Sequence, residues 1–167
     1  MIDRARSAFH RRYLVPAMLV CILSAWPCPA ATQAPSGDFW VVVHESNPVT
    51  ELTADRLSRI FLRKLDRWDD GARIAVVDQA ADSRLYGSFA TAVHRRSSAA
   101  VVSYWQQQIF SGRKMPPPVQ KTDRAVLAFV SGDAHAIGYI ARSTPIGPGV
   151  KVVGVSSERD PDNLAGR

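Results

Sequence analysis

The sequence predicts an α/β domain in which helices pack on the faces of one central sheet. Short apolar runs rich in β-branched residues alternate along the chain with longer segments whose apolar residues recur every three or four positions. The short runs are typical of buried strands, and the longer segments are typical of amphipathic helices. Because each helix and each sheet must bury an apolar face against another element, strands that alternate with helices favour an α/β fold.

The first predicted strand is followed by the first predicted helix. Phe-Trp-Val-Val-Val-His at 39–44 predicts a buried strand, and the turn residues Ser-Asn-Pro at 46–48 end it. Thr53 is expected to be the N-cap of a helix that ends near Lys64. The apolar residues at helical spacing, which form its expected buried face, are Leu57, Ile60 and Phe61.

A second strand and a second helix are predicted next. Asp-Asp-Gly at 69–71 predicts a turn, and Ile-Ala-Val-Val at 74–77 predicts a buried strand. Either Asp82 or Ser83 can cap the helix that follows. The buried face of this helix is expected to hold three residues spaced by four positions, Leu85, Phe89 and Val93.

A third helix is expected to begin at Ser97-Ser98 and to stop at Gly112. Three prolines at 116–118 then force an extended loop, because proline cannot continue a helix. The residues expected along the buried side of this helix are Val102, Trp105 and Ile109.

The C-terminal part is expected to hold a short helix and two strands. Asp123 is expected to cap the helix, and Gly132 is expected to end it. Residues 136–140 and 150–155 predict strands. The apolar residues expected on the buried face of the helix are Val126, Phe129 and Val130. Four large side chains are expected in the core of the whole domain: Phe61, Phe89, Trp105 and Tyr139.

The first thirty or so residues have the three parts of a secretory signal peptide. Arginines precede an apolar run at 13–26, and small residues follow at 28–34. The run is too short to span a membrane, which takes about 20 apolar residues. Cleavage after Ala30 or after Ala34 fits the small-residue preference, and a twin-arginine export route stays open beside the general one because Arg11-Arg12 precedes the run.

These boundaries divide the chain into four expected parts and fix the composition of the mature protein. The parts are a signal peptide at 1–30, a flexible leader at 31–37, a domain at 38–155 and a polar, frayed tail at 156–167. Both cysteines precede the cleavage sites, so the mature chain has no thiol for a disulfide, a nucleophile or a metal. Cleavage also removes four arginines and one aspartate, which lowers the net charge from +6 to +3. A mildly basic exported domain suits an anionic solute or an acidic partner, and not nucleic acid.

Four segments of the chain resemble a known family. They are Leu-Ser-Arg-Ile-Phe-Leu-Arg-Lys at 57–64 with Trp68 and Gly71, Ile-Ala-Val-Val at 74–77, Phe-Ser-Gly at 110–112, and Ala-Ile-Gly-Tyr-Ile at 136–140. In this order they look like segments of the phosphate-binding proteins of bacterial ABC transporters, which are type II periplasmic binding proteins. The resemblance covers roughly residues 52–141 and implies a periplasmic, solute-binding-like protein.

The chain departs from that family in two ways. The family has two lobes that close on the ligand, whereas about 135 mature residues suffice for one compact domain. We therefore expect a single lobe of a type II periplasmic binding protein. The family's anion loop reads R-x-D-x-S-G-T, and here Gln79 and Ala81 replace its Arg and Asp. Ser83 is kept, while Arg84 and Leu85 replace the Gly and Thr.

Ser83 and Arg84 are the first candidate ligand-binding residues, for phosphate or another small anion. A helix N-terminus offers unpaired backbone N–H groups and a positive dipole end, to which Ser83 adds a hydroxyl and Arg84 a positive charge. Ordinary capping by Asp82 or Ser83 explains the same residues, and Asp82 as the cap would repel an anion. Ser46 and Asn47 form a second candidate donor set, for which a plain turn is the preferred interpretation.

Neither a catalytic site nor a metal or cofactor site is indicated. The three histidines beyond the signal peptide lack metal-ligand spacing, and no nucleophile motif is present. We therefore expect a protein that is not an enzyme. It is expected to bind or sense an oxyanion weakly, with a membrane transporter or a sensor protein as partner. The alternative is an adaptor of the cell envelope that keeps the lobe as a scaffold without a ligand. No insertion into the membrane is expected after cleavage.

Overall fold

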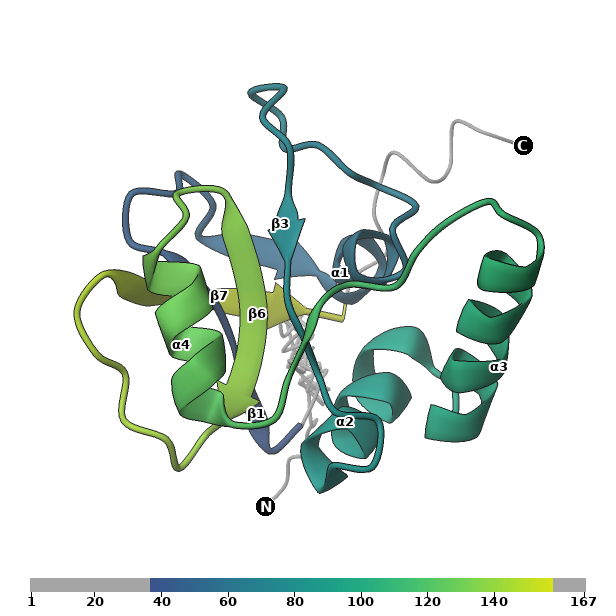
Figure 1. The fold of residues 1–167 in the computed structure, drawn as a ribbon. Helices are drawn as coiled ribbons and strands as arrows, with labels where there is room; N and C mark the ends of the chain where they lie inside the picture. Colours follow the sequence, from purple (N-terminus) through teal and green to yellow (C-terminus); the bar gives the residue numbers. More distant parts are fainter. Residues whose placement is uncertain (1–36, 158–167) are drawn as a thin grey trace, which may run out of the picture. The chain divides into compact units, whose positions relative to one another are not determined.

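A five-stranded mixed sheet forms the centre of the computed structural model, which describes residues 37–157 (Figure 1). The strand order is β2-β7-β1-β6-β3, with β1 antiparallel to β6 and β7 and with the outer pairs parallel. The strands of this sheet are β1 (Phe39–His44), β2 (Glu51–Thr53), β3 (Ala75–Val76), β6 (Ala136–Ala141) and β7 (Val150–Ser156). A separate two-stranded parallel sheet joins β4 (Asp78–Gln79) to β5 (Val119–Gln120).

Helices cover both faces of the central sheet. The helical elements are α1 (Ala54–Phe61), α2 (Arg84–Phe89), the π-helix η1 (Ala90–His94), α3 (Ser98–Phe110) and α4 (Asp123–Ser131). Because strand side chains alternate between faces, Val41 and Val43 join one apolar cluster with α1, α2 and η1, whereas Val42 joins another with α4. The predicted α/β arrangement with helices on one central sheet is confirmed.

Gly138 lets α4 lie close against the sheet. A Cβ atom at this position would lie 2.7 Å from Val126 Cγ1 and 2.8 Å from Val77 Cγ1. Real Cβ contacts are essentially never this short, so any larger residue here would force the neighbouring side chains to shift.

The helix α3 packs against other helices and not against the sheet. Its buried side chains, Val101 and Trp105, join a third apolar cluster with Leu62, Tyr86 and Ala90. In Figure 1, α3 stands beside α2, at the outer side of the domain. The predicted face of α3 was therefore partly wrong. Val101 is buried in place of Val102, and the side chain of Ile109 is 46% exposed.

Most predicted elements are present, with corrections at their ends. The first helix ends at Phe61, before Lys64, and the second passes into a π-helix after Phe89. Thr122 caps α4 in place of Asp123. The short strands β2, β4 and β5 were not predicted. The expected signal peptide, nearly all of the leader and the tail beyond residue 157 lie outside the described residues.

The four large side chains expected in the core are all buried. Phe89 stacks on Tyr139 with ring centroids 3.9 Å apart and an interplanar angle of 5°. Phe61 and Phe39 meet the Phe89 ring at 4.7 and 5.2 Å. The centre of the core is therefore an aromatic cluster between β1, β6, α1 and α2.

Candidate functional site

The loop between β4 and α2 carries the first predicted site residues. Ser83 is the N-cap of α2, with an extended backbone, and its Oγ accepts a hydrogen bond of 3.0 Å from the backbone N–H of Tyr86. Of the two predicted caps, Ser83 is thus the one used, and Asp82 is exposed beside it. Because Asp82 is not the cap, its negative charge does not sit directly on the helix N-terminus. The arrangement that would repel an anion most directly is therefore absent there.

Arg84 projects into solvent from the first turn of α2. Its side chain is 93% exposed, and its Nη2 lies 3.9 Å from Oδ2 of Asp38, which is also exposed. An exposed ion pair at this distance contributes little to stability. Arg84 is therefore an exposed surface cation next to the capped helix N-terminus.

Ser46 and Asn47 lie at the opposite end of β1. Asp38, which pairs with Arg84, precedes the first residue of β1, whereas Ser46 and Asn47 follow its last residue. Six strand residues span about 20 Å. The structure therefore does not bring the two predicted donor sets together.

The local hydrogen bonds of Ser46 and Asn47 fit a turn. Ser46 Oγ lies 2.7 Å from His44 Nδ1, on the surface. Asn47 is 3% exposed, and its Oδ1 accepts from the backbone N–H of Val49 at 3.0 Å while its Nδ2 donates to the Ala134 carbonyl at 3.4 Å. The amide of Asn47 thus joins two loops and is turned away from solvent.

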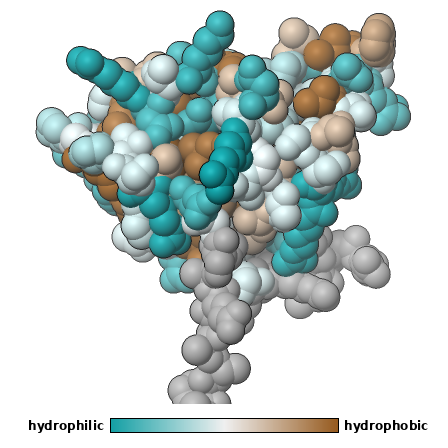
Figure 2. All heavy atoms as spheres, turned by 90° about the horizontal axis from the view of Figure 1, so that it is seen from below, coloured by the Kyte–Doolittle hydropathy of each residue, from teal (hydrophilic) through white to brown (hydrophobic). Residues whose placement is uncertain are grey.

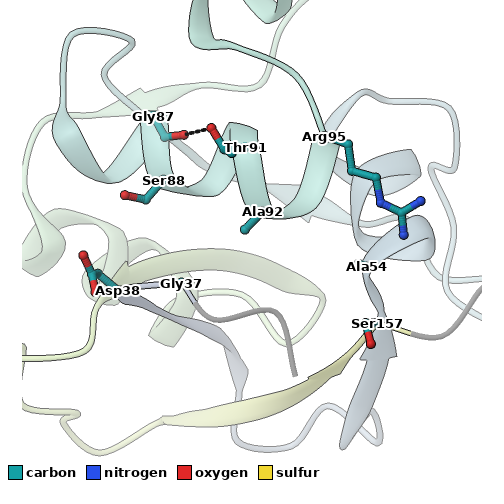
Figure 3. A pocket seen from close by; sticks show the side chains of 9 residues that line it. All are labelled: Gly37, Asp38, Ala54, Gly87, Ser88, Thr91, Ala92, Arg95 and Ser157. Atoms are coloured by element: carbon teal, nitrogen blue, oxygen red, sulfur yellow. Dashed lines mark hydrogen bonds between the residues drawn. The ribbon is translucent and has the colours of Figure 1, made fainter. Parts of the chain in front are cut away.

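A hollow of about 640 Å³ lies beside α2 and η1 (Figure 3). Asp38 and Arg95 lie toward opposite ends of it, and Arg95 Nη2 is 3.8 Å from Asp55 Oδ1. The Thr91 hydroxyl in its wall donates to the Gly87 carbonyl at 3.0 Å. The two charged residues of this hollow, Asp38 and Arg95, are thus each within 4 Å of an opposite charge that lies outside the lining.

A buried polar network lies where β4 meets β6, and the sequence analysis did not predict it. Asp78 Oδ1 accepts hydrogen bonds from the Tyr139 hydroxyl at 2.6 Å and from the Gln79 backbone N–H at 2.8 Å. Gln79 Nε2 donates to Asp123 Oδ1 at 2.7 Å and to the Tyr139 carbonyl at 3.2 Å. Asp123 Oδ2 in turn accepts from Ala141 N at 3.1 Å. The network joins β4, β6 and α4.

Burial shifts the pKa values of this network. Desolvation raises the pKa of Asp78 to about 6, and the hydrogen bonds from Tyr139 and the Gln79 backbone oppose the shift only in part. Burial also raises the pKa of Tyr139, and the Asp78 charge adds to that shift. Tyr86 is raised to a pKa of about 12, by burial first and by Asp78 second. Asp78 is therefore a buried carboxylate at neutral pH, next to two protonated tyrosines.

A cue for this network exists in the sequence. Asp78-Gln79 is a polar pair directly after the apolar run at 74–77, at the strand end where ligand sites of α/β sheets lie. The partner Tyr139 lies 61 residues further along the chain, so the pairing itself is visible only in the fold.

His94 is a second buried titratable group. Its Nδ1 lies 2.9 Å from Ser58 Oγ, and its ring meets that of Phe89 edge to face at 5.4 Å. Burial, with smaller contributions from Arg96 and Lys64, lowers its pKa to about 4. His94 is therefore neutral at physiological pH and acts as a core residue.

Two absences hold for residues 37–157. No three acidic, histidine or cysteine side chains of this part of the chain gather into a metal-binding group. None of its helices has the length and the apolar character needed to cross a membrane.

Comparison with known proteins finds similarity in structure and not in sequence. No protein-family model matches the chain, and no curated protein matches it either. A possible phosphate-binding protein from Planctomyces limnophilus superposes on 77% of the chain with a TM-score of 0.56 and 15% identity. PstS from Borrelia burgdorferi does so over 77% with a TM-score of 0.51 and 14% identity. An ABC-type phosphate transport receptor from Vibrio cholerae covers 77% at a TM-score of 0.49 and 22% identity.

In each case the chain spans only about half of the solved protein: 47%, 51% and 50% in the order given. The expectation of one lobe agrees with the shares of the first two proteins, which are about twice as long as the matched part. The domain therefore has the fold of about half of a phosphate ABC transporter substrate-binding protein, a type II periplasmic binding protein.

Proposed function

We propose that the protein is an exported, solute-binding-like protein whose lobe binds a small oxyanion, such as phosphate, weakly at the N-terminus of α2. The observation that carries the proposal is the capping of α2 by Ser83, within a fold shared with proteins described as phosphate-binding. The positive end of the helix and the exposed Arg84 favour an anion there. The proposed role is binding or sensing, in the periplasm, and not catalysis.

The affinity is expected to be low because the site has one wall. A phosphate at Ser83 would stay in contact with water, and charges interact weakly at high dielectric. The exposed carboxylates of Asp38 and Asp82 also oppose an anion in this region. We expect a dissociation constant in the millimolar range, which corresponds to about 4 kcal/mol of binding free energy.

Isothermal titration of the purified protein with phosphate and with sulfate tests this site. Ser83→Ala with Arg84→Ala is expected to abolish the binding, and added salt is expected to weaken it because an exposed charge is screened. Ser46→Ala is the matched control, since Ser46 lies at the far end of β1 and should leave binding unchanged. Micromolar affinity that survives the double substitution would contradict the proposed site.

Export is tested separately by the N-terminus of the protein in cells. We expect protein from the cell envelope to begin between about residues 31 and 35, because the signal peptide is removed at Ala30 or Ala34. A soluble cytoplasmic pool that retains Met1 would contradict export, whatever the titration shows.

The second candidate function is an adaptor that binds a transporter or a sensor protein and no solute. Exposed apolar side chains favour it: Phe110 is 91% exposed, and Met115 and Val119 are exposed nearby in the chain. On the face shown in Figure 2, hydrophobic atoms also reach the surface between hydrophilic side chains. An absence of heat with both oxyanions would favour the adaptor over the solute-binding function.

A further inference from the structure

A small cavity opens between the β4 strand, α2, α3 and the proline loop. Its volume is about 240 Å³, which is below the usual range for drug-sized ligands and suits a fragment of a few carbon atoms. Its walls are mainly apolar and aromatic, and they are formed by Val102, Trp105, Ile109, Pro116, Pro117 and Val119. Without its polar groups this would be a site for an apolar molecule.

Asp78 is the one charged residue among those that line this cavity. The residue is 7% exposed, and both of its hydrogen bonds end on Oδ1. Among the described residues, Arg56 Nε is the only fully buried side-chain polar atom that lacks a hydrogen-bond partner. Asp78 Oδ2 therefore has no hydrogen-bond partner and keeps some accessible surface, in a residue that lines the cavity.

Two neighbouring side chains add further acceptor capacity. Gln79 lines the cavity, and its Nε2 must be the atom that faces Asp123 Oδ1 and the Tyr139 carbonyl, because both of these groups only accept. This leaves Gln79 Oε1 as the atom of the amide without a hydrogen-bond partner. Tyr86 also lines the cavity and keeps its hydroxyl proton at neutral pH, so its oxygen has free lone pairs.

We propose that this cavity binds a small primary amine with an apolar stem. The ammonium group would lie at Asp78, with its three N–H donors shared between Asp78 Oδ2, Gln79 Oε1 and the Tyr86 hydroxyl. The apolar stem would lie along Trp105 and the prolines, and the faces of Trp105 and Tyr86 also favour a nearby cation. This site shares no residue with the proposed oxyanion site at Ser83 and Arg84.

Charge and geometry together exclude the other small ligands. An anion would meet the buried Asp78 carboxylate without a cation in the cavity wall. A neutral apolar molecule would fill the walls but leave the carboxylate desolvated and unpaired, which is costly. A metal ion would find a single carboxylate, and no metal-binding group of side chains exists in the described residues. The amine alone satisfies both the polar end and the apolar walls.

Binding is tested by NMR titration of the purified protein with butylammonium, butanol and butyrate, which share one stem and differ in charge. The Trp105 indole signal reports on the cavity, and the Trp68 indole, which donates to the His135 carbonyl at 3.1 Å, serves as an internal reference. We expect butylammonium to shift Trp105 and not Trp68, with an affinity about tenfold or more above that of butanol, as a charge-assisted hydrogen bond provides. Equal or tighter binding of butyrate would overturn the proposal.

Asp78→Asn tests the role of the carboxylate, because it keeps the side-chain shape and an acceptor for Tyr139. We expect it to remove the preference for butylammonium over butanol. Asp82→Asn is the matched control, since it removes one exposed carboxylate four residues away and should leave the preference intact. A preference that persists in Asp78→Asn would overturn the proposal. If Asp78→Asn fails to fold, the comparison of butylammonium, butanol and butyrate on the unmodified protein still tests the proposal.

A lysine-containing tripeptide with blocked ends distinguishes a free amine from a protein partner. The lysine side chain carries the same butylammonium group on a backbone. We expect it to bind no more tightly than butylammonium, because the cavity accommodates only a short stem. Clearly tighter binding of the tripeptide would overturn the free amine in favour of a partner protein that inserts a lysine.

Discussion

Two of the three apolar clusters, the one between the sheet and α1, α2 and η1 and the one under α3, differ in how fully they are closed. The cluster between the sheet and α1, α2 and η1 contains an aromatic centre, in which Phe89 and Tyr139 are almost completely buried. The cluster under α3 is smaller, and it borders a cavity and exposed apolar side chains such as Ile109 and Phe110. The first cluster is built for stability, whereas the second leaves apolar surface and the Asp78 carboxylate available to other molecules.

The largest expected effect is the difference in stability between two phenylalanine-to-alanine substitutions, one in the closed cluster and one at the exposed end of α3. Phe89→Ala removes the ring stacked on Tyr139 and is expected to lower the free energy of unfolding by about 3–5 kcal/mol. Phe110→Ala, at a side chain that is 91% exposed, is expected to change it by less than about 0.5 kcal/mol. Urea denaturation of both variants measures the contrast. A loss below about 1 kcal/mol at Phe89 would mean that the closed cluster is assigned wrongly.

The two clusters also respond to acid in opposite directions. The folded-state pKa of His94, beside the closed cluster, is lowered to about 4, so its stabilising effect is lost as the pH falls from about 6.5 to 4. Asp78, beside the open cluster, has a folded-state pKa raised to about 6. Its desolvation penalty is present above pH 6 and disappears as the pH falls to its unfolded value of about 4. In the same pH window, the two groups therefore offset each other.

Asp78→Asn is expected to break this balance, with an effect on the order of 3 kcal/mol or less. Without the compensating carboxyl, the free energy of unfolding should fall more steeply between pH 6 and pH 4 than in the unmodified protein. Denaturant titrations at several pH values measure the slope. An unchanged slope would show that Asp78 is already exposed to solvent in the folded state.

Gly138→Ala tests the face of the sheet that α4 covers. The added methyl group would meet Val126 and Val77 at less than 3 Å, and overpacking of this kind costs about 1–3 kcal/mol. Gly147→Ala is the control, because a Cβ atom there has no neighbour within 4 Å. Thermal denaturation should separate the two variants. Equal stability would mean that α4 lies further from the sheet than described.

The strands and helices with strong local patterns could be predicted from the sequence. The run Val41 to Val43 and the spacing of Leu57, Ile60 and Phe61 leave little choice of element or of face. The short strands β2, β4 and β5 have two or three residues each, and they exist only because a distant segment pairs with them. The local sequence pattern therefore does not predict these strands.

The errors on α3 and at the candidate site have a common cause. Val101 and Val102 are equivalent in type, and only the position of α2 decides which of them is buried. In the same way, Asp78 becomes a buried carboxylate because Tyr139 and the α3 helix lie over it. A cap at Asp82 or Ser83 could be predicted because capping is a local property, and the structure shows that Ser83 is the one used.

The position of β1 in the sheet has a consequence for how the chain acquires its structure. Both partners of β1 lie roughly a hundred residues further along, in β6 and β7. A chain that lacks its last strands has no neighbour for β1 on either side, so no N-terminal fragment can close the central sheet. Pairing between such distant segments slows folding, because the long intervening loop must be ordered first. The domain is therefore expected to stay open until β6 and β7 can pair with β1, and then to fold in one late step.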